Sequence, residues 1–537
     1  MPIAHKILAT LPLTALVSAT ALGASITGTI TGPDGRPFMG AFVAAENPQS
    51  RMTVNVLSDV QGHYRISNLP GATYTVRIEV VGYTSEPRGN VALAVDATAS
   101  LDFALKKTQV RWSDLSTYQG RQILPKTTDH DLSYKDSFFT TCFQSCHSFQ
   151  KRMATQSLDL DDWRTRVRYM SDTMLEGRHL SNATVEDFAS YLNTMFGKAS
   201  PKPASPEELP KYESLIRPVS AAATNIIYVE YDFAADNGMG PWSAVEDKEG
   251  KLWIPYYGRG NGVVRLDPRT GEQTPFQLPS PKLAATGIHS VIPAPDGMVW
   301  FTELAVGRIG RLDPSTGKVT EYQNTPLPDG RRTTAHTVRV DTAGRVWASG
   351  GPAISMFDPK YERFEHYDLR GTYGNAVGLN GDQWFTSFVE DGPIARVSKD
   401  GMLSKFYPPT KGKPQRLEVD ADGTVWFTER RGGKIGRFDP KTETFKEYPL
   451  PGPEPSPYAI GIDRNNMIWY SSHEQDTLGR LDPRSGEVTE YPYPHSEISM
   501  REFFLDTQGR MWFASSVNNK IGYFYLSDRT AASTAPG

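Results

Sequence analysis

Residues 287–303 read Gly287-Ile-His-Ser-Val-Ile-Pro-Ala-Pro-Asp-Gly-Met-Val-Trp300-Phe-Thr-Glu303. A Pro-Asp-Gly turn lies between two short runs rich in β-branched and aromatic residues, so this stretch predicts a β-hairpin. The runs Arg308-Ile-Gly-Arg-Leu-Asp-Pro314 and Lys318-Val-Thr-Glu-Tyr322 follow it and have the same composition. Together the four runs predict one small antiparallel sheet of four strands.

The same unit recurs through the second half of the chain. Its tryptophans are Trp253, Trp300, Trp347, Trp384, Trp426, Trp469 and Trp512, at spacings of 47, 47, 37, 42, 43 and 43 residues. A period near 40–45 with four strands in each unit is typical of a β-propeller, and seven tryptophans predict seven blades over residues 218–537. The last unit ends near Lys520–Tyr525 without a fourth strand. We therefore expect the spare strand Ile226–Tyr231 to complete the seventh blade.

The hairpin geometry predicts which residues line one rim of the central channel. Because the first two strands of a blade are antiparallel, the residue eleven before each Trp should lie beside the residue three after it. The first set is Trp242, His289, His336, Tyr373, Gln415, Tyr458 and Arg501; the second is Tyr256, Glu303, Gly350, Ser387, Glu429, Ser472 and Ser515, with His473 one place further on. Propellers commonly bind ligands at such a mouth, although a polar, water-filled rim without a function is the alternative. The candidate catalytic residues are His289, Glu303, His336, Glu429 and Arg501.

The units Val-Trp-Phe-Thr-Glu, Lys/Arg-Ile-Gly-Arg-Leu/Phe-Asp-Pro and Thr-Glu-Tyr-x-Leu-Pro resemble the virginiamycin B lyase (streptogramin lyase) family over residues 226–526. The resemblance implies a lyase in which a rim His is the base and a Glu fourteen residues later helps to hold Mg²⁺. His289 and Glu303 have this spacing. An imidazole can remove a proton alpha to a carbonyl, and Mg²⁺ held by a carboxylate stabilises the enolate. The resemblance thus implies a Mg²⁺ cofactor and the opening of a cyclic ester or depsipeptide by elimination.

The chain departs from that family in three places. Trp242 stands where the family has a second His one blade before the base. An additional His336 lies one blade after it, and that blade has Gly350 in place of the Glu. The repeat therefore specifies the fold more strongly than the reaction.

The two cysteines of the chain, Cys142 and Cys146, lie in Cys142-Phe-Gln-Ser-Cys146-His147. Three residues separate them, one more than in the C-x-x-C-H haem-attachment motif that the stretch otherwise matches. We expect both thiols to bind one haem c covalently and His147 to be a ligand of its iron. A structural disulfide or a redox pair are the alternatives, but a redox pair should open a helix after a strand in a βαβ unit, and nothing nearby indicates one.

Residues 108–215 have a helical pattern and end in a proline-rich linker. Trp163, Val167 and Met170 lie at i, i+4 and i+7 on one helix face, and a second helix is expected from about Val185 to Phe196. A thioether favours ferrous iron, so we choose Met170 as the sixth iron ligand.

Three other residues are alternative ligands of the iron: Met174, the nearer Met153, and His179 in a bis-histidine arrangement. Any one of these methionines can instead fill the core. The segment resembles class I cytochrome c domains attached to periplasmic oxidoreductases, in which the Met after the Trp and Val binds iron.

The N-terminal part predicts secretion and a small sandwich. Lys6 precedes an apolar run and then small residues, so residues 1–24 are expected to be a signal peptide and the mature protein periplasmic, without a membrane span. Short strands separated by Pro, Asp and Gly turns fill residues 25–107. They resemble the carboxypeptidase regulatory-like (transthyretin-like) domain, which implies a binding or spacer module.

The whole chain is therefore expected to be mainly β and multidomain, with a small β-sandwich, a short helical cytochrome c domain and a seven-bladed propeller. A formal charge of −4 without a basic stripe argues against a nucleic-acid partner. The leading hypothesis is electron transfer by a periplasmic c-type cytochrome whose propeller binds a small molecule or a redox partner protein. The alternatives are a Mg²⁺-dependent lyase and a non-catalytic binding scaffold; a quinone-cofactor dehydrogenase is conceivable, but no feature demands it.

Overall fold

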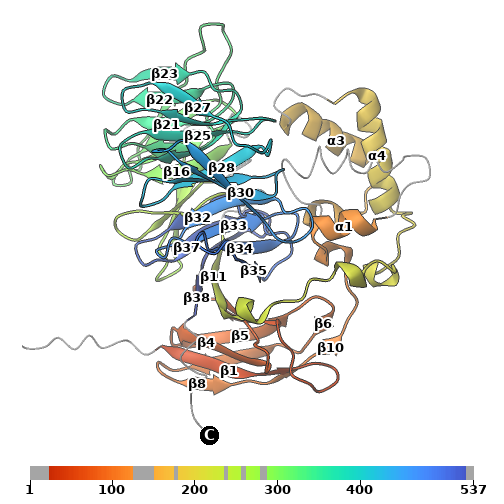
Figure 1. Ribbon diagram of the computed structural model, residues 1–537. Coiled ribbons are helices and arrows are strands. Elements are labelled where there is room, and N and C mark those ends of the chain that lie inside the picture. The colour runs from red at the N-terminus through yellow and green to blue at the C-terminus, as the bar shows by residue number, and fades with distance from the viewer. Residues whose placement is uncertain are drawn as a thin grey trace, which may run out of the picture.

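The computed structural model describes residues 23–124, 150–174, 180–234, 240–255, 262–278 and 287–527. A β-sandwich lies at one end, a propeller at the other, and a group of helices beside the propeller (Figure 1). The chain is therefore mainly β and multidomain, as predicted. The cysteine motif at 142–147 and nearly all of the expected signal peptide lie outside the described residues. Among the described helices, none has the length and apolar character that crossing a membrane requires.

The N-terminal sandwich consists of a mixed layer, an antiparallel layer and a short ribbon. The mixed layer contains β1 (Ala24–Thr31), β4 (His63–Leu69), β8 (Thr98–Ser100) and β9 (Phe103–Ala104); the antiparallel layer contains β2 (Phe42–Asn47), β3 (Met52–Leu57), β5 (Ala72–Glu79) and β7 (Arg88–Leu93); the ribbon pairs β6 (Tyr83–Thr84) with β10 (Lys106–Lys107). In the mixed layer, β1 pairs antiparallel with β4 and parallel with β8 and β9. Alternate residues of the strands, such as Ile26, Val43, Tyr64 and Val76, form the buried core between the layers.

The helical group packs around aromatic side chains. Its elements are η1 (Trp112–Asp114), α1 (Thr117–Ile123), η2 (Gln150–Ala154), α3 (Leu160–Met174) and α4 (Asn182–Phe196), followed by the short turns η3 (Pro206–Glu208), η4 (Glu213–Leu215) and η5 (Ala221–Asn225). Trp163 and Val167 of α3 are buried against Phe188 and Leu192 of α4, in agreement with the predicted helix faces. Ser181 caps α4, because its Oγ accepts a hydrogen bond from the Thr184 amide at 3.1 Å.

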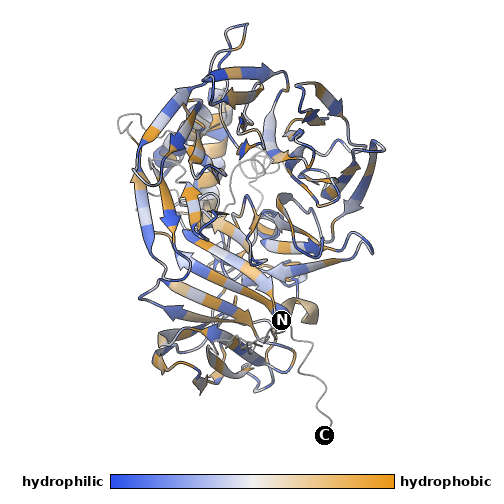
Figure 2. Ribbon diagram, turned by 90° about the vertical axis from the view of Figure 1, so that its left-hand side faces the viewer, coloured by the Kyte–Doolittle hydropathy of each residue, from blue (hydrophilic) through white to orange (hydrophobic). Residues whose placement is uncertain are grey.

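Within the described residues the propeller has seven blades (Figure 2). Blades 1 to 3 are β12 (Val245–Glu246), β13 (Leu252–Pro255), β14 (Gly262–Leu266), β15 (Gln273–Gln277); β16 (Ile288–Pro293), β17 (Val299–Glu303), β18 (Arg308–Leu312), β19 (Val319–Gln323); and β20 (Val338–Val340), β21 (Val346–Ala348), β22 (Ile354–Asp358), β23 (Arg363–Tyr367). Blades 4 to 6 are β24 (Thr372–Val377), β25 (Gln383–Ser387), β26 (Ile394–Val397), β27 (Leu403–Phe406); β28 (Pro414–Val419), β29 (Val425–Glu429), β30 (Lys434–Asp439), β31 (Thr444–Pro449); and β32 (Pro457–Ile462), β33 (Ile468–Ser472), β34 (Thr477–Leu481), β35 (Val488–Pro492). Blade 7 contains β36 (Phe504–Leu505), β37 (Met511–Ser515) and β38 (Lys520–Leu526).

The repeated tryptophan fixes the first turn of most blades. In five blades its indole Nε1 donates to the Asp six residues earlier, at 2.7–2.9 Å, as between Trp426 and Asp420. The other oxygen of Asp420 accepts from the amides of Asp422 and Thr424, both at 2.9 Å. One carboxylate therefore joins the turn between the first two strands to the blade core.

The ring closes as the sequence predicts. Strand β11 (Ile226–Asp232) precedes blade 1 in the chain and pairs antiparallel with β38, from Ile226 opposite Leu526 to Asp232 opposite Lys520. The other edge of β11 pairs with β3 of the sandwich, with Val229 opposite Val54. One eight-stranded sheet, in the order β36-β37-β38-β11-β3-β2-β5-β7, therefore runs from the propeller into the sandwich (Figure 1). The sequence did not predict this second pairing.

A buried carboxylate lies at this junction. Glu230 of β11 accepts hydrogen bonds from Asn55 Nδ2 at 2.9 Å, from Tyr493 Oη at 2.8 Å and from His495 Nε2 at 2.8 Å. Burial disfavours the charged form of His495, but the charge of Glu230 outweighs it and raises the pKa of His495. In the same way, His495 outweighs the burial of Glu230 and lowers its pKa. Each partner therefore favours the ionised form of the other.

Candidate functional site

The structure brings together the residues that lie eleven positions before the tryptophans. The ring of His289 lies 5.1 Å from Trp242 and 3.7 Å from His336, and His336 lies 4.2 Å from Tyr373. Tyr373 lies 6.2 Å from Tyr458, all distances being between ring centroids. The Arg501 guanidinium is 5.2 Å from the Tyr458 centroid and 4.3 Å from that of Trp242, which closes the circle. We call Trp242, His289, His336, Tyr373, Gln415, Tyr458 and Arg501 the channel ring.

Residues of the second predicted set pair with the residue that precedes the expected channel-ring residue. Ile288, and not His289, is opposite Glu303, and in the fifth blade Pro414 is opposite Glu429. A register shift directly follows Ile288 and Pro414, so the channel-ring residues His289 and Gln415 fall within irregular pairing. The residues expected to lie beside each other are therefore offset by one position along the hairpin, because such a bulge re-aims the side chain that follows the pair. Tyr256 lies outside the described residues.

The candidate residues Glu303 and Glu429 lie within their own blades. The Glu303 carboxylate is 4.0 Å from Arg308, and burial followed by the charge of Glu321 raises its pKa to about 7. Burial, followed by the charge of Glu447, raises the pKa of Glu429 to about 8. Both side chains are fully buried, and the Glu429 carboxylate has no hydrogen-bond partner in the described part of the chain. Each is therefore partly or largely protonated near neutral pH.

The histidines at the channel mouth are uncharged at neutral pH. Burial, together with the positive charges of Arg416 and Arg501, holds the pKa of His336 well below its usual value. Burial and the neighbouring His336 do the same for His289. The Nδ1 of His289 lies 3.0 Å from the His336 carbonyl oxygen. Since a carbonyl only accepts, we infer that Nδ1 carries the proton and that Nε2 is an acceptor.

Three buried guanidinium groups surround Tyr458. Those of Arg416, Arg430 and Arg501 lie 5.9, 4.9 and 5.2 Å from its ring centroid. Arg501 Nη1 donates to the Tyr458 hydroxyl at 3.2 Å, and Tyr458 also hydrogen-bonds to Tyr373. Burial would raise the pKa of Tyr458, but the three positive charges outweigh it and lower the pKa. Positive charge therefore surrounds the Tyr458 hydroxyl.

Arg416 and Glu502 form a buried ion pair at 2.5 Å that was not predicted from the sequence. Both lie ten residues before a blade Trp. The seven residues at that position are Ser243, Ser290, Thr337, Gly374, Arg416, Ala459 and Glu502. Five of them are small, so the two charged exceptions of opposite sign were a signal for a pair across the channel.

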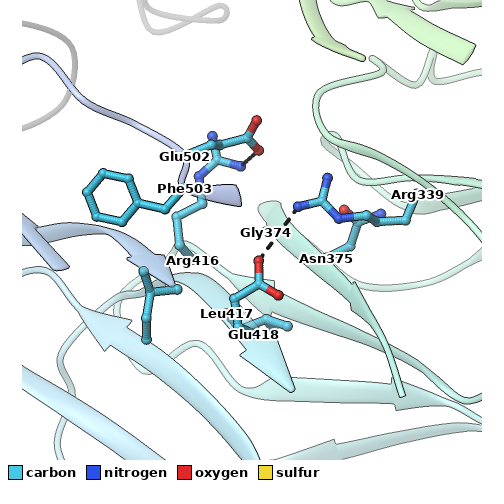
Figure 3. A pocket seen from close by; sticks show the side chains of 9 residues that line it. Arg339, Gly374, Asn375, Arg416, Leu417, Glu418, Glu502 and Phe503 are labelled. Carbon is cyan, nitrogen blue, oxygen red and sulfur yellow. Dashed lines mark hydrogen bonds and ion pairs between the residues drawn. The ribbon is translucent and has the colours of Figure 1, made fainter. Parts of the chain in front are cut away.

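Arg416 and Glu502 also line a small cavity in the channel (Figure 3). A second ion pair, Arg339 with Glu418 at 3.9 Å, faces it. Burial, and then the charge of Glu502, raises the pKa of Glu418 to about 7 even though Arg339 opposes this. The cavity has a volume of about 10 Å³, close to the smallest space that holds one water molecule.

The helical group contacts the propeller beside the channel ring. The Tyr118 amide of α1 donates to the Glu474 carbonyl at 2.9 Å, and Gln150 Nε2 donates to the Asp476 carboxylate at 2.6 Å. Glu474 and Asp476 follow His473, whose ring stacks on Tyr458 at 4.6 Å. Residues on both sides of the segment 125–149 are therefore attached to one loop at the channel mouth.

Two features of the described residues bear on the expected cofactors. Within them, no group of three or more His, Cys, Asp or Glu side chains is arranged to hold a metal ion. Trp163 is 2% exposed, and its indole N–H has no hydrogen-bond partner in that part of the chain, while Met170 on the same helix is half-buried. A buried N–H donor and a nearby thioether suit a haem with its carboxylate groups. His147 and His179 lie outside the described residues, as do any contacts of the Met174 side chain.

The two β domains match two different protein families. Residues 363–536 match the Virginiamycin B lyase family, and residues 25–106 match the Carboxypeptidase regulatory-like domain. A virginiamycin B lyase of Nocardia farcinica is 28% identical over 224 residues, which cover 41% of this chain and 73% of that protein.

Solved structures of lyases also match the propeller. A streptogramin B lyase structure matches with a TM-score of 0.51 and 26% identity, covering 57% of this chain and all of that one. The virginiamycin B lyase of Staphylococcus aureus matches with a TM-score of 0.50 and 25% identity over 56% of this chain and 98% of that one. The propeller is virginiamycin B lyase-like. The N-terminal sandwich is carboxypeptidase regulatory-like, and the helical group between it and the lyase-like propeller falls outside both family matches.

Proposed function

We propose that this chain is a c-type cytochrome that transfers electrons in the periplasm, and that its lyase-like propeller binds a small molecule or a redox partner protein at the channel ring. The observation that supports this most is that residues on both sides of the cysteine-bearing segment are attached to the propeller. Tyr118 before it and Gln150 after it both contact the loop that carries Glu474 and Asp476. That loop is adjacent to the channel ring, so a haem on this segment would work close to whatever the ring binds.

Cys142 and Cys146 would hold the haem covalently, and His147 would bind its iron. Met170 is the proposed sixth ligand and Met174 its alternative, since both lie near the end of α3. The haem, when bound, supplies reversible one-electron chemistry. The indole N–H of Trp163, which has no hydrogen-bond partner among the described residues, would donate to a haem carboxylate, and the core around Trp163 and Phe188 would exclude water.

The propeller would orient the partner of that reaction. The neutral His289 and His336 offer ring nitrogens for hydrogen bonds, and Trp242 and Tyr373 offer partly exposed aromatic faces. Arg501 lies between Trp242 and Tyr458 and supplies positive charge. A ligand held in this way would be positioned without being chemically changed by the ring.

A lyase reaction with Mg²⁺ is the second candidate, and the similarity of the propeller to virginiamycin B lyases favours it. His289 would be the base and Glu303 a Mg²⁺ ligand, with His336, Glu429 and Arg501 as further candidates. The position of Glu303 beside Arg308 and Glu321 gives this reading less support than the channel ring gives to binding. A binding scaffold without any catalytic step is the third possibility.

The visible spectrum of the mature, full-length protein tests the leading proposal. The protein should be produced together with a haem-attachment system, and its spectrum recorded oxidised and then reduced with dithionite. We expect a sharp reduced α-band that stays with the polypeptide after acid–acetone extraction. Mass spectrometry of the wild type, Cys142→Ala and Cys146→Ala should show two thioether bonds reduced to one in each variant.

Controls separate the three readings. His289→Ala should leave the α-band unchanged, and it should abolish turnover of a cyclic depsipeptide only if the protein is a lyase. Chelation of Mg²⁺ should likewise leave the α-band unchanged, and it should abolish turnover of the depsipeptide only if the protein is a lyase. Absence of covalent haem in correctly processed protein would overturn the electron-transfer proposal and favour the lyase or the scaffold.

A further inference from the structure

We propose that the cavity in the propeller channel binds one water molecule between two ion pairs, and that Glu418 exchanges a proton with solvent through this water. The two pairs are Arg416 with Glu502, at 2.5 Å, and Arg339 with Glu418, at 3.9 Å (Figure 3). Both pairs belong to the propeller, so the site does not depend on the haem. Its support comes from the place of the cavity, from polar atoms without partners and from the different exposure of the two pairs.

The cavity lies further along the channel than the channel ring. Arg339 follows the ring residue His336 by three positions and belongs to β20, while Glu418 follows the ring residue Gln415 by three positions and belongs to β28. Both are first strands of their blades, so three further residues lead away from the ring along the channel wall. The volume of about 10 Å³ suits one water molecule and is too small for an organic ligand.

Four buried polar atoms on side chains that line the cavity have no hydrogen-bond partner in the described part of the chain. Two are donors, Nε and Nη2 of Arg416, and two are acceptors, Oε2 of Glu502 and Oδ1 of Asn375. A water molecule can both accept and donate, so it suits this mixed set. An anion would leave the two acceptors unpaired, and a cation would be repelled by Arg416.

The second ion pair connects the cavity to solvent. The Glu418 side chain is 29% exposed, whereas that of Glu502 is 3% exposed, so Glu418 lies on the open side of the cavity. The distance of 3.9 Å between Arg339 and Glu418 is too long for a direct hydrogen bond, and a water molecule can bridge such a separation. A proton that leaves the Glu418 carboxyl group passes to a neighbouring water and then to solvent, and uptake follows the reverse path.

The charged groups around Glu418 set its affinity for the proton. Arg416 precedes it on β28, Arg339 faces it from β20, and Glu502 faces it from the segment before β36. Among the described residues, the strands β24, β25, β29 and β32, which contact β28, bring no charged side chain to the cavity. Burial raises the pKa of Glu418 to about 7, Arg339 and Arg416 oppose this, and Glu502 adds to it. Glu418 therefore takes up a proton as the pH falls through about 7.

Proton uptake at Glu418 changes the charge beside the channel ring. The Arg416 guanidinium lies 5.1 Å from the ring centroid of Tyr373, and its Nη1 donates to Thr337 Oγ1 at 2.8 Å. When Glu418 is protonated, Glu502 alone balances the two arginines of the cavity. The positive charge next to Tyr373 is then larger than when Glu418 is ionised.

A titration of the full-length protein from about pH 5 to 9 tests the proton exchange, with the C=O band of protonated carboxyl groups followed by infrared difference spectroscopy. We expect Glu418→Gln to remove one component of this band, with a midpoint of about 7. Glu429→Gln is the matched control and should remove a different component, with a midpoint of about 8. A titration of Glu418→Gln that equals the wild type would overturn the inference.

Variants of the neighbouring charges should move the Glu418 midpoint in opposite directions. Arg339→Gln should raise it by about one pH unit and Glu502→Gln should lower it by about as much. Arg331→Gln is the control, because Arg331 pairs with Asp329 at 2.7 Å on the surface, and it should leave the midpoint unchanged. If circular dichroism shows that Glu502→Gln does not fold, Arg339→Gln decides alone. A midpoint that Arg339→Gln does not move would contradict the inferred site.

A high-resolution crystal structure of the full-length protein tests the water itself. We expect one ordered peak within hydrogen-bond distance of Arg416 and of Glu502 or Asn375. Crystals soaked in bromide provide the probe for an anion, because its anomalous scattering identifies it. Bromide at this position, or a cavity without an ordered peak, would overturn the inferred water site.

Discussion

At the scale of residues, removing one partner of the buried pair of Arg416 and Glu502 should destabilise the protein by more than the intact pair stabilises it. Both side chains are 4% exposed, so loss of one partner leaves the other charged and unpaired in the channel. We expect Arg416→Met to destabilise the propeller by about 3–5 kcal/mol. Urea unfolding followed by tryptophan fluorescence measures this change.

The double variant Arg416→Met with Glu502→Leu should recover most of that loss, since neither charge is then buried alone. Arg363→Met is the control, because Arg363 pairs with Glu365 at 2.5 Å on the surface. It should change stability by less than about 1 kcal/mol. Equal losses in the single and double variants would show that Arg416 acts through packing instead of charge.

The raised pKa of Glu429 predicts a pH dependence. Its carboxyl group has a pKa of about 8 in the folded protein against 4.5 when unfolded, so the folded state holds the extra proton between these values. Stability therefore falls as the pH rises from about 4.5 to 8. We expect Glu429→Gln to match the wild type near pH 5 and to be more stable by a few kcal/mol at pH 8–9, on a scale of about 1.4 kcal/mol per pKa unit.

Thermal melts of the wild type and Glu429→Gln at a series of pH values test this. Glu487→Gln, at an exposed position of blade 6, is the control and should follow the wild type throughout. A constant difference between Glu429→Gln and the wild type at all pH values would mean that Glu429 is already ionised at pH 5.

The positions of the channel-ring residues could be predicted from the sequence because each has a fixed distance from a repeated tryptophan. The bulge after Ile288 could not, since nothing in the repeat distinguishes an irregular pair from a regular one. Arg430 was also missed, because it lies in the turn directly after β29, outside the two positions that were counted from the tryptophan. The repeat therefore predicts which residues surround the channel, but not which atoms face each other.

At the scale of elements, the His495–Glu230 pair should control how firmly β11 is held between the two β domains. The folded pKa of His495 is raised above 6.5, so its contribution is complete below pH 6.5 and is lost as the pH rises through the folded pKa. The pKa of Glu230 is lowered below 4.5, so its contribution is complete above pH 4.5 and is lost on acidification through the folded pKa. Both contributions are complete between about pH 4.5 and 6.5.

His495→Gln should therefore lower the melting temperature most in that window and less at alkaline pH. Limited proteolysis of the connection between sandwich and propeller should become faster in the variant at pH 6. His366→Gln serves as the control, because His366 contacts Ser355 and Thr325 within its own part of the propeller. A deficit that does not change between pH 6 and 9 would exclude a role for the charge of His495.

Strand β11 also shows the limit of prediction for elements. Its pairing with β38 was predictable because the last blade lacked a fourth strand and the run Ile226–Tyr231 belonged to no other blade. Its pairing with β3 could not be predicted, because no sequence feature of an edge strand identifies the strand that it will pair with in another domain. Ile227, Val229 and Tyr231 suit a strand that is buried on both edges, yet they would suit an ordinary blade strand equally well.

At the scale of the whole molecule, the shared eight-stranded sheet should make the sandwich and the propeller unfold together. Removal of residues 23–107 would expose the edge of β11 that normally pairs with β3. Exposed strand edges pair with other chains. We expect the truncated protein to self-associate and to melt at a lower temperature, as measured by light scattering coupled to size-exclusion chromatography and by calorimetry.

The full-length protein at the same concentration is the control and should show one cooperative transition. A monomeric truncated protein with an unchanged propeller transition would show that β38 alone is enough to hold β11. Two well-separated transitions in the full-length protein would likewise contradict the expected coupling.

The position of β11 has a consequence for the order in which a nascent chain can assemble. Residues 226–232 are synthesised nearly three hundred residues before their partner at 520–526. The ring therefore cannot close until the last strand has been made. Since N-terminal domains generally fold first during synthesis, β3 is available to dock β11 as soon as it emerges. The sandwich would thus act as a template that keeps one half of the closure in place while the blades are added. A chain that stops before residue 520 would keep that template and still be unable to close.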